Sequence, residues 1–390
     1  MLNLEQYRQQ FPALSNKAYF NFGGQGTMSE AALSAIYQAY KKTQTDGPFG
    51  LKINAWLQEE VADTRAAIAA ELGVTPETIT LTENVTVGCN IALWGINWQP
   101  GDHILLTDCE HPGIIAAVGE IARRFQVEVS TCPILATLNA GDPVAAIAAH
   151  LQGNTRLVVI SHLLWNTGQL LPLGKIVELC HNHTPKPVKI LVDAAQSVGS
   201  LPLKLSELKA DFYAFTGHKW LCGPTGLGGL YVRPEVREEL QPTFIGWRGI
   251  TTKKALPQGW KTDGSKFEVA TSAYPQFVGL RTAIAIQQKW GNSEERYQQI
   301  CQNSEYLWQR LQEIKLLNCL LSSPPEAGLV SFQLANIAHQ KFVKSLEDRG
   351  LLLRTIADPD CIRACVHYFT STAEIDQLVT VIKELLDGNC

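Results

Sequence analysis

The segment AFTGHKWLCGPTG, Ala214–Gly226, decides the fold class and raises the central chemical question of the sequence. An apolar run typical of a buried strand stops here at a Thr-Gly-His-Lys corner, and a proline and several glycines follow. Because burial disfavours the charged form of lysine, Lys219 either points into water or lies in a pocket that uses its amine.

Length and composition restrict the class of protein. The chain has 390 residues, more than one ordinary core accommodates, so two lobes are expected. The formal charge of -4 and the lack of a basic stripe argue against nucleic-acid binding. The longest apolar runs fall short of the roughly 20 residues of a membrane span, and Met1–Glu5 shows no secretory signal. We therefore expect a cytoplasmic protein without membrane contact.

The cysteines are scattered through expected helices and strands, and none forms a Cys-x-x-Cys pair. This distribution is typical of reduced thiols in the cytoplasm, so neither a disulfide framework nor a metal site is expected. The ten cysteines are Cys89, Cys109, Cys132, Cys180, Cys222, Cys301, Cys319, Cys361, Cys365 and Cys390.

Short β-rich runs alternate with helical stretches from about residue 80 to residue 232. The runs are mostly apolar throughout, which is the mark of strands covered on both faces of a sheet. Helices such as Ile114–Phe125 and Pro143–Leu151 lie between them, so the pattern predicts an α/β domain with a mostly parallel sheet. The expected strands are Ile79–Leu81, His103–Thr107, Leu157–Ile160, Ile190–Val192, Phe212–Phe215 and Leu230–Val232.

After about Gly291 the pattern changes to that of a small α+β lobe. A charged helical stretch leads to the strand candidate GLVSFQLAN, and two more strand candidates, LLLRTI and CIRACVHYF, precede a closing helix. We expect residues 1–20 to pack on the small lobe, residues 21–285 to form the large domain and residues 286–390 to form the small domain.

Polar residues follow the expected strands at their carboxyl ends, where ligands bind in open parallel sheets. The turn TENVTVGCN opens a helix whose N–H groups and Thr86 hydroxyl could hold a phosphate. Taken alone, each such residue is more simply a helix cap or a packed side chain. Five such strand ends in one sheet, however, would point into a single crevice, and together they suit an aromatic, phosphorylated cofactor with a carbonyl group. The other residues at these ends are His111, Asn166, Asp193, Gln196, Thr216, His218 and Lys219.

Three stretches carry a resemblance to a known family: SHLLWNTGQLLPL (Ser161–Leu173), LVDAAQSVGSLPL (Leu191–Leu203) and DFYAFTGHKWLCGPTGLGGLYV (Asp211–Val232). They closely resemble the class V aminotransferase family, in its cysteine desulfurase-like branch of pyridoxal-phosphate (PLP) enzymes. The resemblance runs from about Tyr19 to Phe369. It implies fold type I of the PLP-dependent transferases, with a large domain built on a mostly parallel sheet of seven strands and a small C-terminal α+β domain.

The resemblance also implies roles in binding PLP. Lys219 would bind the cofactor covalently and later move protons, Asp193 would pair with the pyridine nitrogen, and His111 would stack on the ring. These roles fit the chemistry. An ionised Asp193 beside a protonated ring nitrogen makes the ring an electron sink. Lys219 can act as a base only if its pKa is lowered. Asn166 and Gln196 would reach the phenolic oxygen of the ring. The residues implied for the phosphate are Val85, Thr86, Thr216, His218 and Thr271.

Thr271 lies in FEVATSAYP, which resembles the segment that enters the partner's active site in this family. A homodimer with shared active sites is therefore implied. CIRACVHYFTSTAEID resembles the closing strand of the family, whose arginine binds the α-carboxylate of the substrate. That role falls on Arg363, and a bidentate guanidinium–carboxylate pair suits it.

A cystine substrate has a second amino-acid end that also needs a binding site. Arg354 is one candidate, and Trp247 and Arg248 of the segment GWRG are others. The alternative for this segment is that it binds no substrate, with Arg248 exposed to solvent and Trp247 packed in the protein. In YFNFGGQGT, Gly23 and Gly24 could let the substrate approach the backbone.

One departure from the family determines the reaction that we expect. Cysteine desulfurases carry a nucleophilic cysteine on a loop of the small lobe, in one subtype within an Arg-x-Gly-His-His-Cys-type stretch. Here LLLRTIADPDCIRAC matches only at Arg354-Thr355, and Cys361 lies on an expected strand beside Arg363. Without a loop thiol, β-elimination from cystine or cysteine is favoured, giving pyruvate, ammonia and persulfide or sulfide. An iron–sulfur apoprotein is a candidate acceptor of the sulfur.

Three alternatives stay open on the sequence alone. The first is a cysteine desulfurase that uses Cys361 or another thiol and forms alanine with an enzyme-bound persulfide. The second is a PLP epimerase or aminotransferase of the same fold. The third is a binding protein that has kept the fold and lost catalysis, against which the intact set Lys219, Asp193 and His111 argues.

Overall fold

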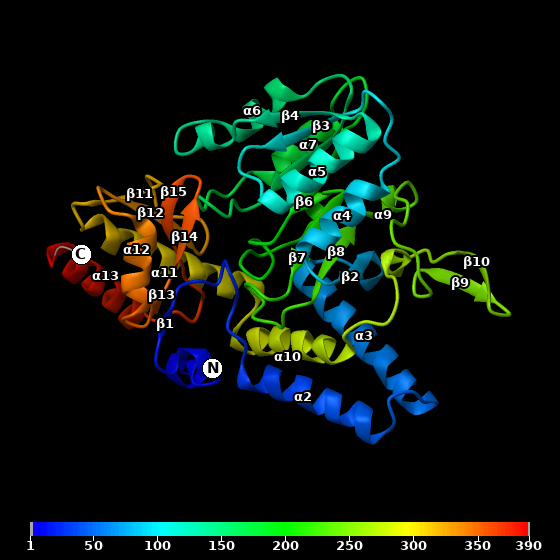
Figure 1. Cartoon of the computed structure of the whole chain (residues 1–390), viewed down its shortest axis with the longest axis horizontal. Helices are drawn as coiled ribbons and strands as arrows, with labels where there is room; N and C mark the ends of the chain where they lie inside the picture. The colour runs from blue at the N-terminus through cyan, green and yellow to red at the C-terminus, as the bar shows by residue number, and fades with distance from the viewer. Residues whose placement is uncertain (1–2, 389–390) are drawn as a thin grey trace.

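A sheet of seven strands forms the centre of the large lobe in the computed structural model, which describes residues 3–388 (Figure 1). Strand β8 runs antiparallel to both of its neighbours, β2 and β7, and the ladders from β7 to β4 are parallel. The predicted α/β class with a mostly parallel sheet is confirmed. In sheet order the strands are β2 (Ile79–Thr82), β8 (Gly228–Val232), β7 (Phe212–Thr216), β6 (Lys189–Asp193), β5 (Thr155–Ser161), β3 (His103–Thr107) and β4 (Glu128–Cys132).

The apolar strands are explained by cores on both faces of this sheet. In β5, Leu157 and Val159 belong to the core formed with α4 and α5, whereas Val158 and Ile160 belong to the core formed with α3, α7 and α10. A strand buried on both faces needs apolar residues at consecutive positions. The helices of this lobe are α2 (Glu30–Thr45), α3 (Leu51–Leu72), α4 (Val85–Gly95), α5 (Pro112–Phe125), α6 (Pro143–His150), α7 (Leu173–His181), α8 (Leu205–Leu208), α9 (Pro234–Arg237) and α10 (Tyr274–Trp290).

The small lobe is built on an antiparallel sheet in the order β11-β12-β15-β14, with its own apolar core. Capping boxes at Asn292 and Ser371 begin the two long helices, which explains why both start where they do. The N-terminal segment joins this lobe, because β1 pairs with β13. The elements are α1 (Leu4–Arg8), β1 (Ala18–Tyr19), α11 (Ser293–Gln312), β11 (Leu317–Cys319), β12 (Leu329–Leu334), α12 (His339–Glu347), β13 (Leu351–Leu352), β14 (Arg354–Ala357), β15 (Asp360–Cys365) and α13 (Thr372–Asp387).

Several strands escaped the sequence analysis for a common reason. Strand β4 is the edge of the large sheet and is largely exposed, so its sequence EVSTC has no apolar run. The hairpin of β9 (Ile250–Lys253) and β10 (Leu256–Trp260) projects from the body of the molecule and is also exposed (Figure 1). Of these three strands only β4 reaches a core, through its last residue Cys132, so hydrophobic patterning could not reveal them.

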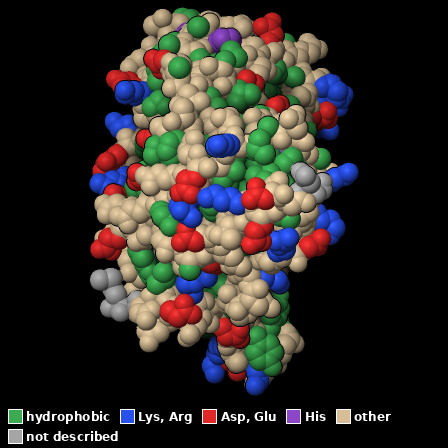
Figure 2. Space-filling view, turned by 90° about the vertical axis from the view of Figure 1, so that its left-hand side faces the viewer, with side chains coloured by type: hydrophobic (Ala, Val, Ile, Leu, Met, Phe, Trp, Pro, Cys, Tyr) green, Lys and Arg blue, Asp and Glu red, His purple; other side chains and the backbone are tan. Residues whose placement is uncertain are grey.

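The face at the small-lobe end carries acidic and basic side chains close together (Figure 2). Many are paired within this lobe, as in the contacts of Lys383 and Arg310 with Glu313. Among residues 3–388, no helix is both long enough and apolar enough to cross a membrane.

Candidate active site

The carboxyl ends of β3, β5, β6 and β7 meet the first turn of α4 around one small pocket. Most of the residues predicted to bind a cofactor line it, although they come from segments far apart in the sequence. The lining residues are Val85, Thr86, His111, Ser161, Leu163, Trp165, Asp193, Ala195, Gln196 and Lys219.

Lys219 lies in this pocket, which answers the question raised by the Thr-Gly-His-Lys corner. Strand β7 ends at Thr216, and the N–H of Gly217 donates to the carbonyl of Leu227 at 2.9 Å, so the chain turns sharply. The pKa of Lys219 is lowered to about 8, mainly by burial and also by Arg363 and Arg354, whereas Asp193 opposes the shift. A large share of this amine is therefore neutral near pH 8 and can act as a base or nucleophile.

Asp193 is the buried last residue of β6. Burial raises the pKa of its carboxyl group, whereas the N–H of Ala195, Lys219 and His111 lower it. The Ala195 N–H donates to Oδ1 at 2.9 Å, which fixes the carboxyl group at the pocket wall. A cationic group bound here would hold the carboxyl ionised.

His111 is the N-cap residue of α5, and its Nδ1 accepts the N–H of Gly113 at 3.2 Å. Partial burial lowers its pKa, so the ring is mainly neutral at pH 7. The ring contacts that of Trp165, with centroids 5.7 Å apart and planes at 64°. A neutral, anchored imidazole at this position can stack against a flat ligand.

The residues predicted to bind phosphate lie at two neighbouring positions. Val85 and Thr86 form the first turn of α4, at the positive end of the helix dipole. The hydroxyl of Thr216 lies 2.6 Å from Nδ1 of His218. Thr271 is exposed and lies outside the pocket lining of its own chain, so its predicted role in a partner's site stays a prediction.

Arg363 lies fully buried in β15, with its side chain toward the large lobe. Its Nη1 donates to the carbonyl of Trp165 at 2.6 Å, whereas Nε and Nη2 have no partner among the described residues. Nε and Nη2 together form one edge of the guanidinium, which can bind a carboxylate in bidentate fashion. Arg354 is the cross-strand partner of Arg363 in β14 and is exposed, so a second cation borders the first.

The two glycines predicted near the substrate differ in their surroundings. A Cβ on Gly23 would lie 2.9 Å from Nη2 of Arg363 and 2.9 Å from Sγ of Cys365, so glycine is needed beside this arginine. A Cβ on Gly24 would instead meet the side chain of Asn21 at 2.7 Å. Gly23 is therefore the one that borders the free guanidinium edge.

Gln196 and Asn166 are partly occupied by protein contacts. Gln196 donates from Nε2 to the carbonyl of Gly23 at 2.9 Å and accepts the indole N–H of Trp220 at 2.9 Å. Asn166 donates from Nδ2 to the carbonyl of Asp358 at 3.1 Å. Each carboxamide nitrogen keeps a second N–H for a ligand, so both residues can still contact a cofactor. Asn166 also connects the two lobes, because Asp358 belongs to the small one.

The GWRG segment is arranged differently from the rest of the predicted site. Arg248 is buried in an ion pair with Glu268 and donates to Ser272 at 3.0 Å, so this arginine is committed to internal contacts. Trp247 is 60% exposed and lies outside the pocket lining. Its substrate-binding role therefore stays a prediction that a single chain does not support.

Trp165 is the main site residue that sequence reasoning missed. Its indole N–H donates to the carbonyl of Cys109 at 3.0 Å, its ring contacts His111, and its own carbonyl accepts Arg363. One residue thus connects the stacking ring to the guanidinium. The available signal was its position directly before Asn166, in a polar turn after a strand.

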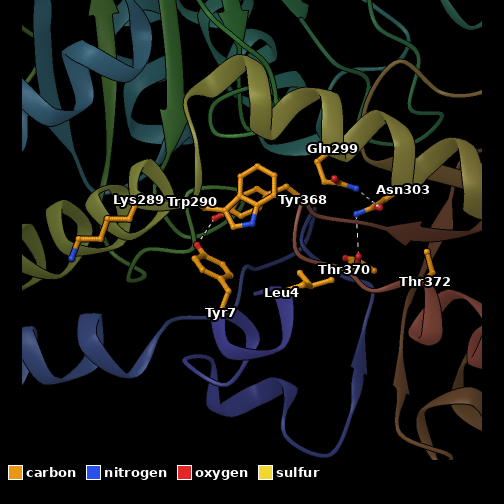
Figure 3. A pocket seen from close by; sticks show the side chains of 9 residues that line it. All are labelled: Leu4, Tyr7, Lys289, Trp290, Gln299, Asn303, Tyr368, Thr370 and Thr372. Atoms are coloured by element: carbon orange, nitrogen blue, oxygen red, sulfur yellow. Dashed lines mark hydrogen bonds between the residues drawn. The ribbon is translucent and has the colours of Figure 1, made fainter. Parts of the chain in front are cut away.

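A larger pocket of about 280 Å³ lies elsewhere, between α1, the end of α10, α11 and the segment after β15 (Figure 3). The hydroxyls of Tyr7 and Tyr368 meet there at 2.6 Å, and Asn303 donates to the carbonyl of Thr370 at 3.0 Å. None of the strand-end residues lines it. We place the active site at the smaller pocket because the convergent titratable groups lie there.

Two solved structures are similar to this chain over nearly its whole length. One solved structure is a complex of the cystine C–S lyase C-DES with its reaction product, cysteine persulfide; it is 53% identical, with a TM-score of 0.94, and the match covers 96% of this chain and 99% of that one. A C-DES mutant with glycine covalently linked to its PLP cofactor is also 53% identical, with a TM-score of 0.95, over 96% and 98% of the two chains.

More distant relatives have been named for a related activity. A probable cysteine desulfurase of Halobacterium salinarum is 26% identical, and the match covers 98% of this chain and 96% of that protein. The family described as aminotransferase class-V matches residues 26–378, which is most of the sequence. The chain therefore belongs to the class V aminotransferase family.

Proposed function

We propose that this protein is a PLP-dependent carbon–sulfur lyase that cleaves cystine by β-elimination. Cystine and water would give cysteine persulfide, pyruvate and ammonia. The likeness to C-DES over nearly the whole chain supports this choice of substrate. A persulfide leaves more readily than a thiol because its conjugate acid is stronger, so the disulfide is also the chemically easier substrate.

The observation that carries the choice of elimination over desulfuration is the short hairpin of β14 and β15. Its strands pair from Arg354–Arg363 to Ala357–Asp360, and this leaves a tight turn where a desulfurase would need a cysteine loop. Cys361 lies fully buried in β15, with its thiol 4.0 Å from the carbonyl of Asn166. Burial raises the pKa of this thiol to about 12, so it is neither mobile nor ionised at neutral pH.

The residues of the pocket fit PLP. Asp193 offers a buried carboxyl group for a protonated ring nitrogen, His111 a neutral ring for stacking, and Lys219 an amine with a lowered pKa for the covalent bond. When bound, PLP withdraws electrons from the Cα–H bond of an amino acid, so that the proton can be removed and a β-substituent expelled. The remaining candidate contacts are Val85, Thr86, Asn166, Gln196, Thr216 and His218.

The side chains of this chain then supply binding and proton transfer. The free edge of Arg363 binds the α-carboxylate, and Gly23 leaves room for that contact. Lys219 removes the proton from Cα, because its amine has a large neutral fraction near pH 8. Arg354, on the exposed side of Arg363, binds the carboxylate at the far end of cystine.

The enzyme is proposed to be a homodimer. Phe244, Ile245 and Trp247 are 69%, 63% and 60% exposed, and such a run of apolar side chains is typical of a surface that another protein covers. The segment with Thr271 follows in the same region, since the carbonyl of Val269 accepts the N–H of Arg248 at 3.2 Å. The persulfide product could pass its sulfur to an iron–sulfur apoprotein.

The lowered pKa of Lys219 predicts how covalent loading of PLP depends on pH. The neutral amine is the reactive form, so the loading rate of cofactor-free protein should rise about tenfold per pH unit and level off near pH 8, the pKa of this amine. The visible absorbance of the bound cofactor measures this rate. An ordinary lysine would instead show a rate that keeps rising to about pH 10, and that result would contradict the lowered pKa.

Product analysis with cystine and cysteine side by side tests the proposed function. We expect pyruvate, ammonia and persulfide from cystine, and the same products in the variant Cys361→Ala, with kcat within about twofold of wild type because a buried strand thiol takes no part in chemistry. Alanine with a protein-bound persulfide would instead establish a desulfurase. A product racemised at Cα, or a requirement for a 2-oxo acid, would identify an epimerase or an aminotransferase.

A further inference from the structure

Glu110 is a buried carboxyl group that the proposed mechanism does not use. It directly precedes His111, is 3% exposed and lies outside the pocket lining. Burial raises its pKa to about 7; hydrogen bonds from Thr107 and Ser161 lower it, and Asp193 raises it. Burying a carboxyl group costs free energy unless its oxygens are hydrogen-bonded, so the contacts of this group indicate what it does.

Both oxygens of Glu110 are hydrogen-bonded to the ends of two strands. Oε1 accepts the hydroxyl of Thr107 at 2.6 Å and the backbone N–H of Ser161 at 2.8 Å. Oε2 accepts the hydroxyl of Ser161 at 2.9 Å. Thr107 is the last residue of β3 and Ser161 the last residue of β5, so one carboxyl group bridges the two strand ends.

These contacts lie where the backbone ladder between the two strands stops. The backbone pairs of β3 and β5 end at Leu106 and Val159, so beyond this point the Glu110 side chain joins the two strand ends to each other. On the far side, Ser161 pairs in register with Asp193 of β6. The bridge therefore connects the loop that carries His111 to the strand that carries Asp193.

We propose that Glu110 is a positioning residue that fixes His111 relative to Asp193, so that a planar ligand is held between the two. The inference rests on the proposed function, because it assumes that PLP is this ligand. Glu110 itself contacts neither cofactor nor substrate. A shift of His111 away from the ring plane would loosen the cofactor and misalign Cα with Lys219.

Two variants of the PLP-loaded enzyme separate positioning from charge. In Glu110→Gln, the amide oxygen can still accept from Thr107 and the Ser161 N–H, and the amide N–H can donate to the Ser161 hydroxyl. Glu110→Ala removes all three bonds. We expect kcat on cystine to fall about 10- to 100-fold in Glu110→Ala and about threefold or less in Glu110→Gln.

The visible circular dichroism of bound PLP is the second readout, because it reports how the ring is held and needs no substrate. The band should weaken in Glu110→Ala and persist in Glu110→Gln. Thr107 lies outside the pocket lining, and Thr107→Val removes its hydrogen bond to Glu110. The band and kcat should fall in this variant as well, but by less, which keeps the test valid if Glu110→Ala does not fold.

Two results would overturn the positioning role. One is a folded Glu110→Ala variant with the wild-type band and kcat, and the other is a Glu110→Gln variant as impaired as Glu110→Ala. Failure of the proposed function is recognised separately, because wild-type protein would then lack a PLP band or release no pyruvate from cystine before any variant is compared.

Discussion

The variant Lys219→Ala is expected to lose C–S cleavage almost completely, with kcat lower by about four orders of magnitude, the upper range for removing an acid–base group. The amine of Lys219 is both the proposed covalent anchor of PLP and the proposed base, and alanine replaces neither role. PLP can still enter, because Asp193 and His111 remain. We therefore expect the cofactor to be removable by dialysis, with pyruvate release from cystine as the assay.

Stability and a matched control distinguish this loss from misfolding. Burial disfavours the ammonium form of Lys219, so Lys219→Ala should not lower the melting temperature of the cofactor-free protein. Lys266 is also buried, but it donates to the carbonyl of Arg237 outside the pocket. Lys266→Ala should lower stability and keep covalent PLP. Normal turnover in Lys219→Ala would refute the central assignment.

The large sheet was predictable because both of its faces are buried. Consecutive apolar residues predicted strands such as β5 and β6. Because ligands bind at the carboxyl ends of parallel strands, the residues that follow such strands, Asp193 and Lys219 among them, became candidates for the site. Edge strand β4 and the β9–β10 hairpin gave no such signal, because most of their residues are exposed. The hydrophobic pattern of the sequence thus revealed only those strands of the large sheet that are buried on both faces.

Side-chain partners were much less predictable, because they come from distant parts of the chain. Gln196 bonds to Gly23, 173 residues away, and Arg363 to Trp165, 198 residues away. No local pattern indicates that Arg248 turns to Glu268, that Trp165 connects two site residues, or that one edge of Arg363 stays free. The contact of Arg363 with Trp165 depends on how the two lobes meet, and the others depend on how segments of the large lobe pack together.

The two arginines of the β14–β15 hairpin provide the second large prediction. Truncating one partner of a buried, hydrogen-bonded charge pair costs about 2–5 kcal/mol, so Arg363→Ala should lower kcat/KM about 30- to several-thousand-fold. Arg363→Lys should recover little of this loss, because an ammonium has no planar edge that can both hold Trp165 and bind a carboxylate. Steady-state kinetics on cystine and on cysteine measure both variants.

Comparing the substrates assigns each arginine to its own carboxylate. Both substrates have the α-carboxylate that Arg363 is proposed to bind, so Arg363→Ala should impair them equally. Only cystine has a second carboxylate, so Arg354→Ala should raise KM for cystine and leave cysteine nearly unchanged. Because Arg354 is exposed, the effect should be smaller and should shrink at high salt. Equal losses on both substrates in Arg354→Ala would show that the distal end of cystine is bound elsewhere, and the exposed GWRG segment of a partner subunit would then be the next region to test.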